Sequence, residues 1–244
     1  MTATPAWPPK SLPRLFVREA LGAAARVELG AGQANYLGNV MRLGAGAELL
    51  VFDGASGEWF ARITEAGKKR MTLAVERQTR EAETIPDVWL AFAPVKRHQT
   101  DWLVEKATEL GAARLIPVMT RRTVAERVKL ERLEAIAIEA AEQCGRTRLP
   151  VIAEPVTLAR LIEANGRMLY FADESGGEAP AAAFKRGPAT ILIGPEGGFT
   201  DEERSLVRGA PNSMPISLGP RILRAETAAL AALAAYMASA GDWR

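Results

Sequence analysis

Two similar segments near the C-terminal end restrict the fold more than any other feature of the sequence. In each one, a short apolar stretch runs into a loop rich in glycine and proline, and a helical pattern follows. The first comprises residues 189–193, the loop 194–200 and a helix to about residue 208; the second comprises residues 214–218, the loop 219–224 and an Ala/Leu-rich helix to about residue 240. Strand, loop and helix repeated in this order predict an α/β fold with a parallel sheet.

The loop after residue 193 has almost no side-chain bulk. Its first five residues include three glycines and a proline, so the backbone can lie against a flat ligand. Thr200 and Glu203 have the spacing of a capping box, which predicts the start of a helix. The loop matches neither the phosphate-binding pattern G-x-x-x-x-G-K-[ST] nor the dinucleotide fingerprint G-x-G-x-x-G. The two usual nucleotide-loop interpretations are therefore excluded.

The loop after residue 218 carries charge. Gly219 lets the backbone approach a ligand closely, and Pro220 removes a donor and fixes the turn. Arg221, Arg224 and Glu226 follow at the expected start of the last helix, where backbone N–H groups are unpaired. From these residues alone two interpretations remain open: a functional cluster, or solvated charges beside a helix.

Further strands are expected upstream, at residues 87–95, 115–119 and 168–174, with helices at 101–110 and 130–144. In open parallel sheets, ligands bind at the carboxyl ends of the strands. The loops after Phe171, Ile193 and Leu218 should therefore converge on one pocket.

The first part of the chain has a different pattern. Short strand-like stretches at residues 15–17, 26–29, 48–52, 58–63 and 71–75, separated by glycine-bearing turns and with a short helix at 33–41, predict a small β-barrel. We expect a domain of residues 1–80 followed by a second domain of residues 81–244. Residues 1–80 contain 11 Lys and Arg against 7 Asp and Glu, a net charge of +4 that favours a polyanionic partner.

Composition excludes several classes of protein. The single cysteine excludes a disulfide framework. Because the chain also contains only one histidine, we expect no metal site. No apolar run approaches the length of a membrane span, and the N-terminus lacks a secretion signal. A cytoplasmic protein is the expectation.

Two long motifs carry a family resemblance: Ile193-Gly194-Pro195-Glu196-Gly197-Gly198-Phe199, and Leu218-Gly219-Pro220-Arg221-Ile222-Leu223-Arg224-Ala225-Glu226-Thr227-Ala228. In this order and at this spacing they resemble the RsmE family, the 16S rRNA uracil-N3 methyltransferases of the SPOUT superfamily. The resemblance covers nearly the whole chain and implies a PUA-like RNA-binding barrel, then a parallel sheet with a C-terminal trefoil knot. One departure is that family members often carry histidine near Asn35-Tyr36, where this chain has none.

The resemblance implies S-adenosyl-L-methionine as the cofactor and assigns residues to it. The predicted cofactor-binding residues are Phe171, Ala172, Gly194, Pro195, Glu196, Gly197, Gly198, Leu218, Gly219, Ile222, Leu223 and Thr227. Uracil N3 carries a proton at neutral pH, so the base must be unpaired and negative charge on its carbonyls must be stabilised. We expect Arg221 or Arg224 to supply that charge, with Glu226 orienting the arginine or accepting the proton.

The resemblance also implies 16S rRNA within the small ribosomal subunit as the substrate and a homodimer as the assembly. Candidate RNA contacts are Arg14, Arg18, Arg42, Arg121, Arg122 and Arg146. Two alternatives remain open from the sequence. One is a non-catalytic RNA-binding or ribosome-assembly protein that keeps the fold; the other is ribose 2′-O methylation.

Overall fold

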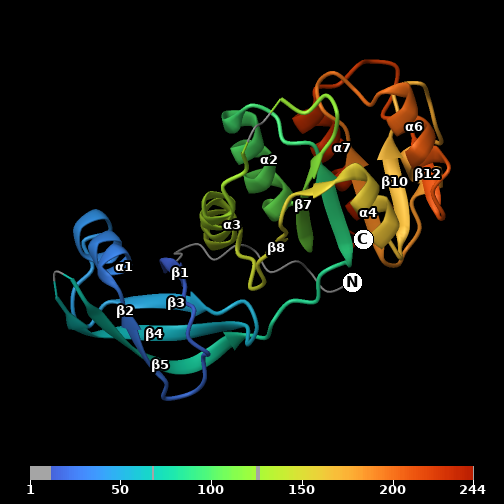
Figure 1. The fold of residues 1–244 in the computed structure, drawn as a ribbon. Helices are drawn as coiled ribbons and strands as arrows, with labels where there is room; N and C mark the ends of the chain where they lie inside the picture. Colours follow the sequence, from blue (N-terminus) through green and yellow to red (C-terminus); the bar gives the residue numbers. More distant parts are fainter. Residues whose placement is uncertain (1–11, 68, 125–126, 244) are drawn as a thin grey trace. The chain divides into compact units, whose positions relative to one another are not determined.

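The computed structural model describes residues 12–67, 69–124 and 127–243 and consists of two compact units (Figure 1). The first unit comprises Met1–Glu83 together with Glu142–Arg148. The second comprises Thr84–Ala141 and Leu149–Arg244. The chain thus returns once to the first unit after leaving it.

The first unit is built on a five-stranded sheet with the order β1-β3-β4-β5-β2. Its elements are β1 (Arg14–Phe16), β2 (Arg26–Leu29), α1 (Ala31–Asn35), the π-helical turn η1 (Tyr36–Val40), β3 (Glu48–Phe52), β4 (Glu58–Ala66) and β5 (Met71–Arg80). Only β1 and β3 pair in parallel; the other neighbours are antiparallel. The five strands are those expected from the sequence, and β4 and β5 pair with register shifts that bend the sheet.

One apolar core holds this unit together. Residues alternate between buried and exposed along β2, and its buried Val27 and Leu29 join Leu49, Ile63 and Leu73 in a single cluster. Gly57, where the chain enters β4, has φ of +96°, and a Cβ there would lie 2.3 Å from the Arg80 carbonyl oxygen. Glycine is therefore required at this turn.

The second unit contains a parallel sheet with the order β12-β10-β11-β6-β7-β8, with β9 paired to β7. Its strands are β6 (Val88–Phe92), β7 (Arg114–Met119), β8 (Val151–Ile152), β9 (Val156–Thr157), β10 (Met168–Ala172), β11 (Ala189–Ile193) and β12 (Ser213–Ile216). Every recorded pairing between these strands is parallel. The predicted α/β class with a parallel sheet is confirmed.

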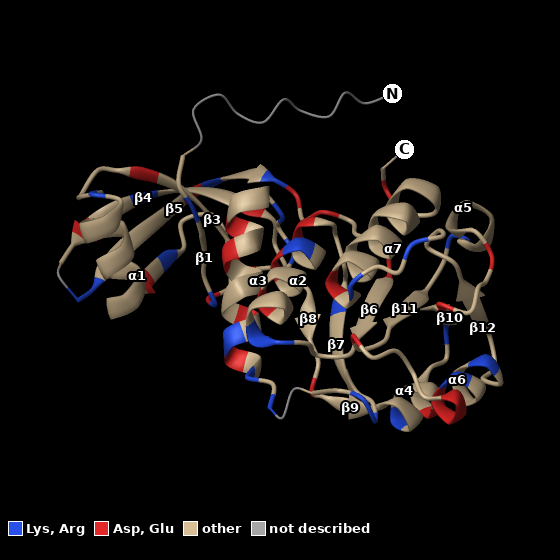
Figure 2. Ribbon diagram, turned by 90° about the horizontal axis from the view of Figure 1, so that it is seen from above, with Lys and Arg blue, Asp and Glu red and all other residues tan. Residues whose placement is uncertain are grey.

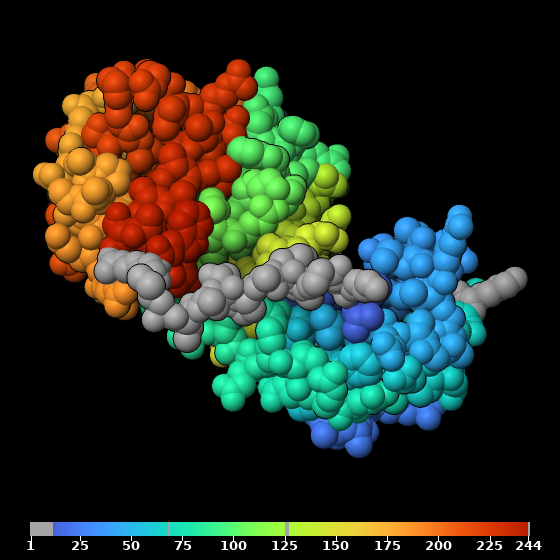
Figure 3. All heavy atoms as spheres, turned by 180° about the vertical axis from the view of Figure 1, so that it is seen from behind, coloured from blue at the N-terminus to red at the C-terminus, as the bar shows by residue number. Residues whose placement is uncertain are grey.

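Helices cover both faces of this sheet (Figure 2). They are α2 (Arg97–Glu109), α3 (Leu130–Cys144), α4 (Leu158–Ala164), α5 (Pro180–Ala183), α6 (Asp201–Arg208) and α7 (Ala225–Ser239). One core cluster joins the sheet to α2, α3, α5 and α7, and another joins it to α4 and α6. Successive residues of a strand point to opposite faces of the sheet and so pack into different cores. In β10, Tyr170 lies in the first core cluster and Phe171 in the second. Figure 3 shows α2 and α7, in green and red, side by side on one face of this unit.

Some element bounds differ from expectation. Helix α2 begins at Arg97, four residues before the predicted start, because the Thr100 hydroxyl bonds the Val95 backbone and stabilises the first turn. Helix α4 was not predicted, although the Thr157 side chain caps it by accepting from the Arg160 N–H. Within the residues that the structure describes, no helix is long and apolar enough to cross a bilayer.

Candidate active site

Four loops of the second unit line one cavity of about 690 Å³, and each loop follows the carboxyl end of a parallel strand. The loops follow β6, β10, β11 and β12, which the sheet order places as neighbours. The convergence predicted for the last three loops is therefore observed, as expected for the strand ends of an open parallel sheet. The lining residues that carry the argument below are Lys96, Gln99, Asp173, Gly194, Gly219, Arg221, Ile222 and Arg224.

The loop after β11 is held against its own helix. The Thr200 hydroxyl accepts from the Glu203 N–H, and the Glu203 carboxylate accepts from the Thr200 N–H, so the predicted capping box is present. A Cβ at Gly194 would lie 3.0 Å from the Phe199 ring, which is buried. A side chain at Gly194 would therefore require the Phe199 ring to shift by a few tenths of an ångström.

The loop after β12 is open toward the cavity. Gly219 has φ of +103°, a conformation that side-chain-bearing residues rarely adopt, and no heavy atom lies within 4 Å of a Cβ built there. Arg221 and Arg224 are both exposed and both line the cavity. Ile222 is 81% exposed, which leaves a large apolar side chain at the cavity without a covering group among the described residues.

Glu226 differs from the arginines that precede it. It lies in the first turn of α7, which Arg224 begins as N-cap, and only 7% of its surface is exposed. Its Oε2 has no hydrogen-bond partner among the described residues, and Glu226 does not line the cavity. This position does not fit the predicted direct acceptance of the N3 proton, because a group that accepts the proton must reach the substrate. The other predicted role, that of orienting the arginine, does not require Glu226 to reach the substrate and stays a prediction.

Asp173 anchors the loop after β10. Its side chain is 1% exposed, pairs with Arg208 at 2.7 Å and accepts from the Ser175 N–H at 2.9 Å. Burial alone would raise the pKa of Asp173, but the Ser175 hydrogen bond and the Arg208 ion pair outweigh burial and hold that pKa below its usual value. The Asp173 side chain is therefore ionised at neutral pH and fixes the cavity wall.

The loop after β7 supports the loop after β11. The Arg122 guanidinium donates to the Gly197 carbonyl oxygen at 2.6 Å, and the Arg121 N–H donates to the Glu203 carboxylate at 2.8 Å. The sequence predicted both arginines as RNA contacts. The structure places Arg122 against the glycine-rich loop, whereas the Arg121 side chain is 69% exposed.

Nine of the twelve predicted cofactor residues line the cavity, and three do not. Phe171 is fully buried in the core beneath α4 and α6, because its side chain lies on that face of β10. Gly197 lies under Arg122, and Thr227 is an exposed residue of α7. In each case the sequence places the residue in the right segment but does not reveal which way it faces.

Sequence reasoning missed the fourth loop. Lys96 and Gln99, which follow β6, line the cavity. The signal was present, since β6 is also a parallel strand whose carboxyl end lies at the same edge of the sheet.

The remaining predicted RNA contacts belong to the first unit and fall into two groups. Arg18 and Arg42 are exposed. Arg14 is not: its side chain is 5% exposed, pairs with Glu58 at 2.7 Å and donates to the carbonyl oxygens of Glu142 and Arg146. The Arg146 side chain is 6% exposed and lies 3.5 Å from the Glu83 carboxylate. Burial of Arg14 and Arg146 argues against the predicted phosphate contacts, and both arginines instead anchor the returning segment 142–148.

The cavity fits a ligand such as S-adenosylmethionine. Its walls combine apolar side chains with loop backbone, and the open space beside Gly219 admits a ligand against the main chain. In the described part of the chain no cluster of three or more side chains could hold a metal ion.

Comparisons with known proteins agree with both units. A family model described as "RNA methyltransferase domain" matches residues 82–237, and one described as "RNA methyltransferase PUA domain" matches residues 29–76. A ribosomal RNA small subunit methyltransferase E from Rickettsia conorii is 33% identical over 227 residues, which cover 91% of this chain and 93% of that protein. A relative of the same name from Synechocystis sp. is 37% identical over 231 residues, covering 91% and 76%.

Two solved structures share the fold over nearly the full length. A methyltransferase from Legionella pneumophila, in complex with bound SAM, has a TM-score of 0.90 at 29% identity and covers 96% of this chain and 100% of its own. A ribosomal RNA small subunit methyltransferase E from Neisseria gonorrhoeae, bound to S-adenosyl methionine, has a TM-score of 0.87 at 28% identity, with coverage of 96% and 100%.

Proposed function

The chain belongs to the RNA methyltransferase family that includes the ribosomal RNA small subunit methyltransferases E, and on this premise we propose that it methylates N3 of a uridine in 16S rRNA. It is an S-adenosylmethionine-dependent methyltransferase acting on small-subunit ribosomal RNA. The choice of uracil N3 rests on the resemblance carried by residues 218–228. The observation that carries the proposal is the cavity where four strand-end loops meet, with two exposed arginines at its wall.

The loops after β11 and β12 would hold the cofactor. At Gly194 and Gly219 the cofactor can come close to the backbone. Leu218 and Leu223 form an apolar wall that suits an adenine ring. When bound, S-adenosylmethionine provides a methyl group on a positively charged sulfonium, which a nitrogen nucleophile can take without covalent catalysis by the protein.

The residues of the chain must then prepare the acceptor. N3 lies on the Watson–Crick edge of uracil, so the base has to be unpaired or flipped out before it enters the cavity. As the N3 proton passes to solvent water at the open cavity, negative charge develops on the flanking carbonyl oxygens. Arg221 or Arg224 stabilises that charge, an effect of roughly 10²–10³-fold by analogy with removal of one oxyanion donor. Glu226, buried in the first turn of α7 two residues after the N-cap Arg224, would orient that arginine.

Two domains with different roles are proposed. Residues 1–80 form the PUA-like RNA-binding domain and residues 81–244 the methyltransferase domain, from which segment 142–148 returns to the first unit; the matches at 29–76 and 82–237 support this division. Arg18, Arg42 and Arg121 remain our proposed RNA contacts, since their side chains are exposed. The activity on ribosomal RNA supports a cytoplasmic location.

We also propose a trefoil knot at the C-terminal end and a homodimer, both implied by the SPOUT resemblance. Supporting the dimer, Trp102 on α2 is 39% exposed and Trp243, just beyond α7, is 52% exposed. Helices α2 and α7 pack side by side, so these indoles offer apolar surface for a second copy of the chain.

Two measurements test the proposed activity. Calorimetric titration of the purified protein with S-adenosylmethionine should give one site per chain. Labelled cofactor should then transfer its methyl group to small ribosomal subunits from a strain that lacks this protein. Binding without transfer to any ribosomal RNA would favour the non-catalytic alternative.

A further inference from the structure

A second pocket lies beside the cofactor cavity within the same unit. Its volume is about 290 Å³, and it is lined by the end of the β6 loop, the first turn of α2 and the segment leading into α3. Pro94, Val95 and Leu133 are buried and form an apolar floor. Thr100 also lines the pocket.

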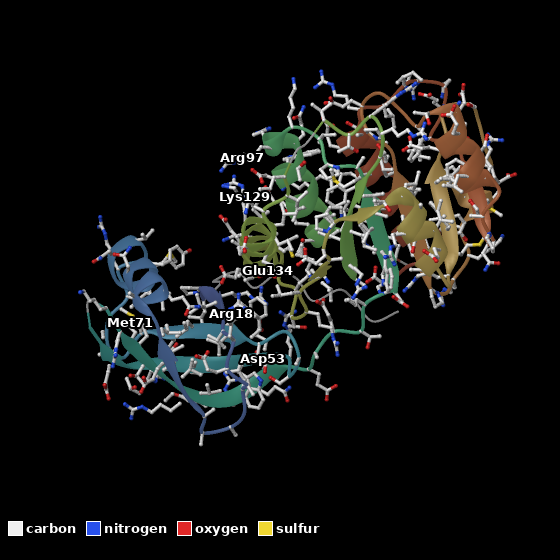
Figure 4. All side chains as sticks on the ribbon, in the orientation of Figure 1. Arg18, Asp53, Met71, Arg97, Lys129 and Glu134 are labelled. Atoms are coloured by element: carbon white, nitrogen blue, oxygen red, sulfur yellow. The ribbon has the colours of Figure 1, made fainter. Side chains whose placement is uncertain are left out.

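Cations surround this floor. Lys96, Arg97, Arg127 and Lys129 line the pocket, and all four are exposed. No carboxylate among the described residues forms a recorded ion pair with them, and basic ribbon segments gather around the start of α3 in Figure 2. Figure 4 labels Arg97 and Lys129, whose side chains extend outward on the same side of the unit. Arg132 differs, since Asp101 holds it in a two-pronged ion pair at 2.6 and 2.9 Å.

The first turn of α2 separates this pocket from the cofactor cavity. Lys96, the N-cap of α2, lines both. Gln99 lines only the cofactor cavity, and Thr100, the next residue, lines only the second pocket. The two pockets are therefore adjacent. When the target base of an RNA strand lies in the cofactor cavity, the neighbouring nucleotide lies close to the second pocket.

We propose that the second pocket binds the nucleotide adjacent to the target nucleotide in the RNA strand. This inference rests on the proposed function. A nucleotide has an apolar base face and an anionic phosphate, and the pocket combines an apolar floor with exposed cations that form no ion pair with the described residues. The flanking base lies on Pro94, Val95 and Leu133, and the phosphates on either side of it lie against Arg97 and Lys129. Lys96 contacts the phosphate that joins the flanking and target nucleotides.

The pocket gives the enzyme two properties. Phosphate contacts fix the register of the strand, so the target base reaches the cavity in one position. Contact with the flanking nucleotide also helps to hold the strand open, since enzymes that act on an extracted base read its neighbours as well.

The test uses charge reversal on the full-length protein with small ribosomal subunits as substrate. Arg97→Glu and Lys129→Glu should each raise KM for the subunits at least tenfold and leave the Kd for S-adenosylmethionine unchanged. Each variant should also reduce the slope of log affinity against log salt by about 1, the effect of one lost phosphate contact. Arg160→Glu is the matched control, because Arg160 is an exposed cation on α4, across the sheet, and should behave as the wild type.

Milder variants and a second readout keep the result decisive. Arg97→Ala and Lys129→Ala should show smaller effects in the same direction, and thermal unfolding should report an intact fold in every case. If the two pocket reversals differ from Arg160→Glu by less than twofold in KM and in salt slope, the inference is wrong. If the wild type transfers no methyl group, the proposed function fails. Filter binding of naked 16S rRNA by the same variants then decides the pocket separately, since unchanged affinity contradicts it.

Discussion

The Arg122 guanidinium donates a 2.6 Å hydrogen bond to the carbonyl oxygen of Gly197, in the loop after β11. This contact joins two loops that are 75 residues apart in the sequence, and a Cβ at Gly197 would lie 3.4 Å from the Arg122 side chain. The glycine-rich loop carries little side-chain packing of its own. Arg122, which belongs to a different loop, therefore helps to make the glycine-rich loop rigid, as a preformed cofactor site requires.

Replacing Arg122 should weaken cofactor binding. Arg122→Ala removes a hydrogen bond of about 1 kcal/mol, so the Kd for S-adenosylmethionine should rise roughly fivefold by calorimetry. Arg121→Ala is the control, because Arg121 is tied to Glu203 through its backbone N–H, which alanine retains. Equal effects of the two substitutions would show that net charge near the loop, rather than the Gly197 contact, governs binding.

The positive φ of Gly219 should matter for the ligand as well as for the fold. Gly219→Ala places a Cβ where no heavy atom lies within 4 Å, so the strain of about 1–2 kcal/mol comes from the backbone alone. Gly176→Ala is matched to it, with φ of +105° and equally open space, but Gly176 does not line the cavity. Both variants should lose similar thermal stability, and only Gly219→Ala should lose cofactor affinity. Loss of affinity in both would assign the effect to general destabilisation.

The two exposed arginines of the loop after β12 should affect turnover rather than binding. Arg221→Ala and Arg224→Ala leave the core intact, and the one that stabilises the developing charge should lower kcat by roughly 10²–10³-fold. Single-turnover kinetics with saturating subunits separates this effect from RNA affinity. Full turnover in both variants with normal RNA binding would remove the arginines from the mechanism.

Acid should weaken the second unit through Asp173. The folded-state pKa of Asp173 lies below its unfolded value of 3.8, so its ion pair with Arg208 contributes fully at neutral pH. The contribution is lost as the pH falls below about 4, because protonation then favours the unfolded state. Asp173→Asn should flatten the fall in unfolding free energy between pH 5 and 3, by at most about 1.4 kcal/mol per pH unit.

The control for the acid prediction is Asp201→Asn, since the Asp201 side chain is 98% exposed. This variant should retain the wild-type pH profile. An unchanged profile in Asp173→Asn would mean that other groups dominate acid unfolding.

The sequence predicted most of the elements because local patterns determine them. Residues 130–144 and 189–193 have the observed bounds of α3 and β11, and the Thr200–Glu203 capping box starts α6 as expected. Strand order, in contrast, depends on packing between distant segments, so the position of β6 beside β11 could not be read from spacing. The carboxyl end of the predicted strand at residues 87–95 was the signal available for the loop after β6, but its place beside the other three loops depends on that strand order.

The direction of individual side chains was the second property that the sequence could not predict. The sequence could place Arg14, Arg122 and Arg146 in basic segments but could not show that each holds backbone or a carboxylate, or that Arg14 and Arg146 are buried. Such burial is decided by tertiary contacts, which pair Arg14 with Glu58, 44 residues away. An arginine in a sequence motif is therefore a weaker indication of an RNA contact than a cation that is exposed and forms no ion pair with the described residues, such as Arg97 or Lys129.

Nucleoside mass spectrometry tests the central claim most directly. Small ribosomal subunits from a strain lacking this protein are treated with the purified protein and labelled S-adenosylmethionine, and the 16S rRNA is digested to nucleosides. The account predicts label in 3-methyluridine, formed roughly 10²–10³-fold more slowly by whichever of Arg221→Ala and Arg224→Ala removes the charge-stabilising group. Label in a 2′-O-methylated nucleoside, with none in 3-methyluridine, would contradict it.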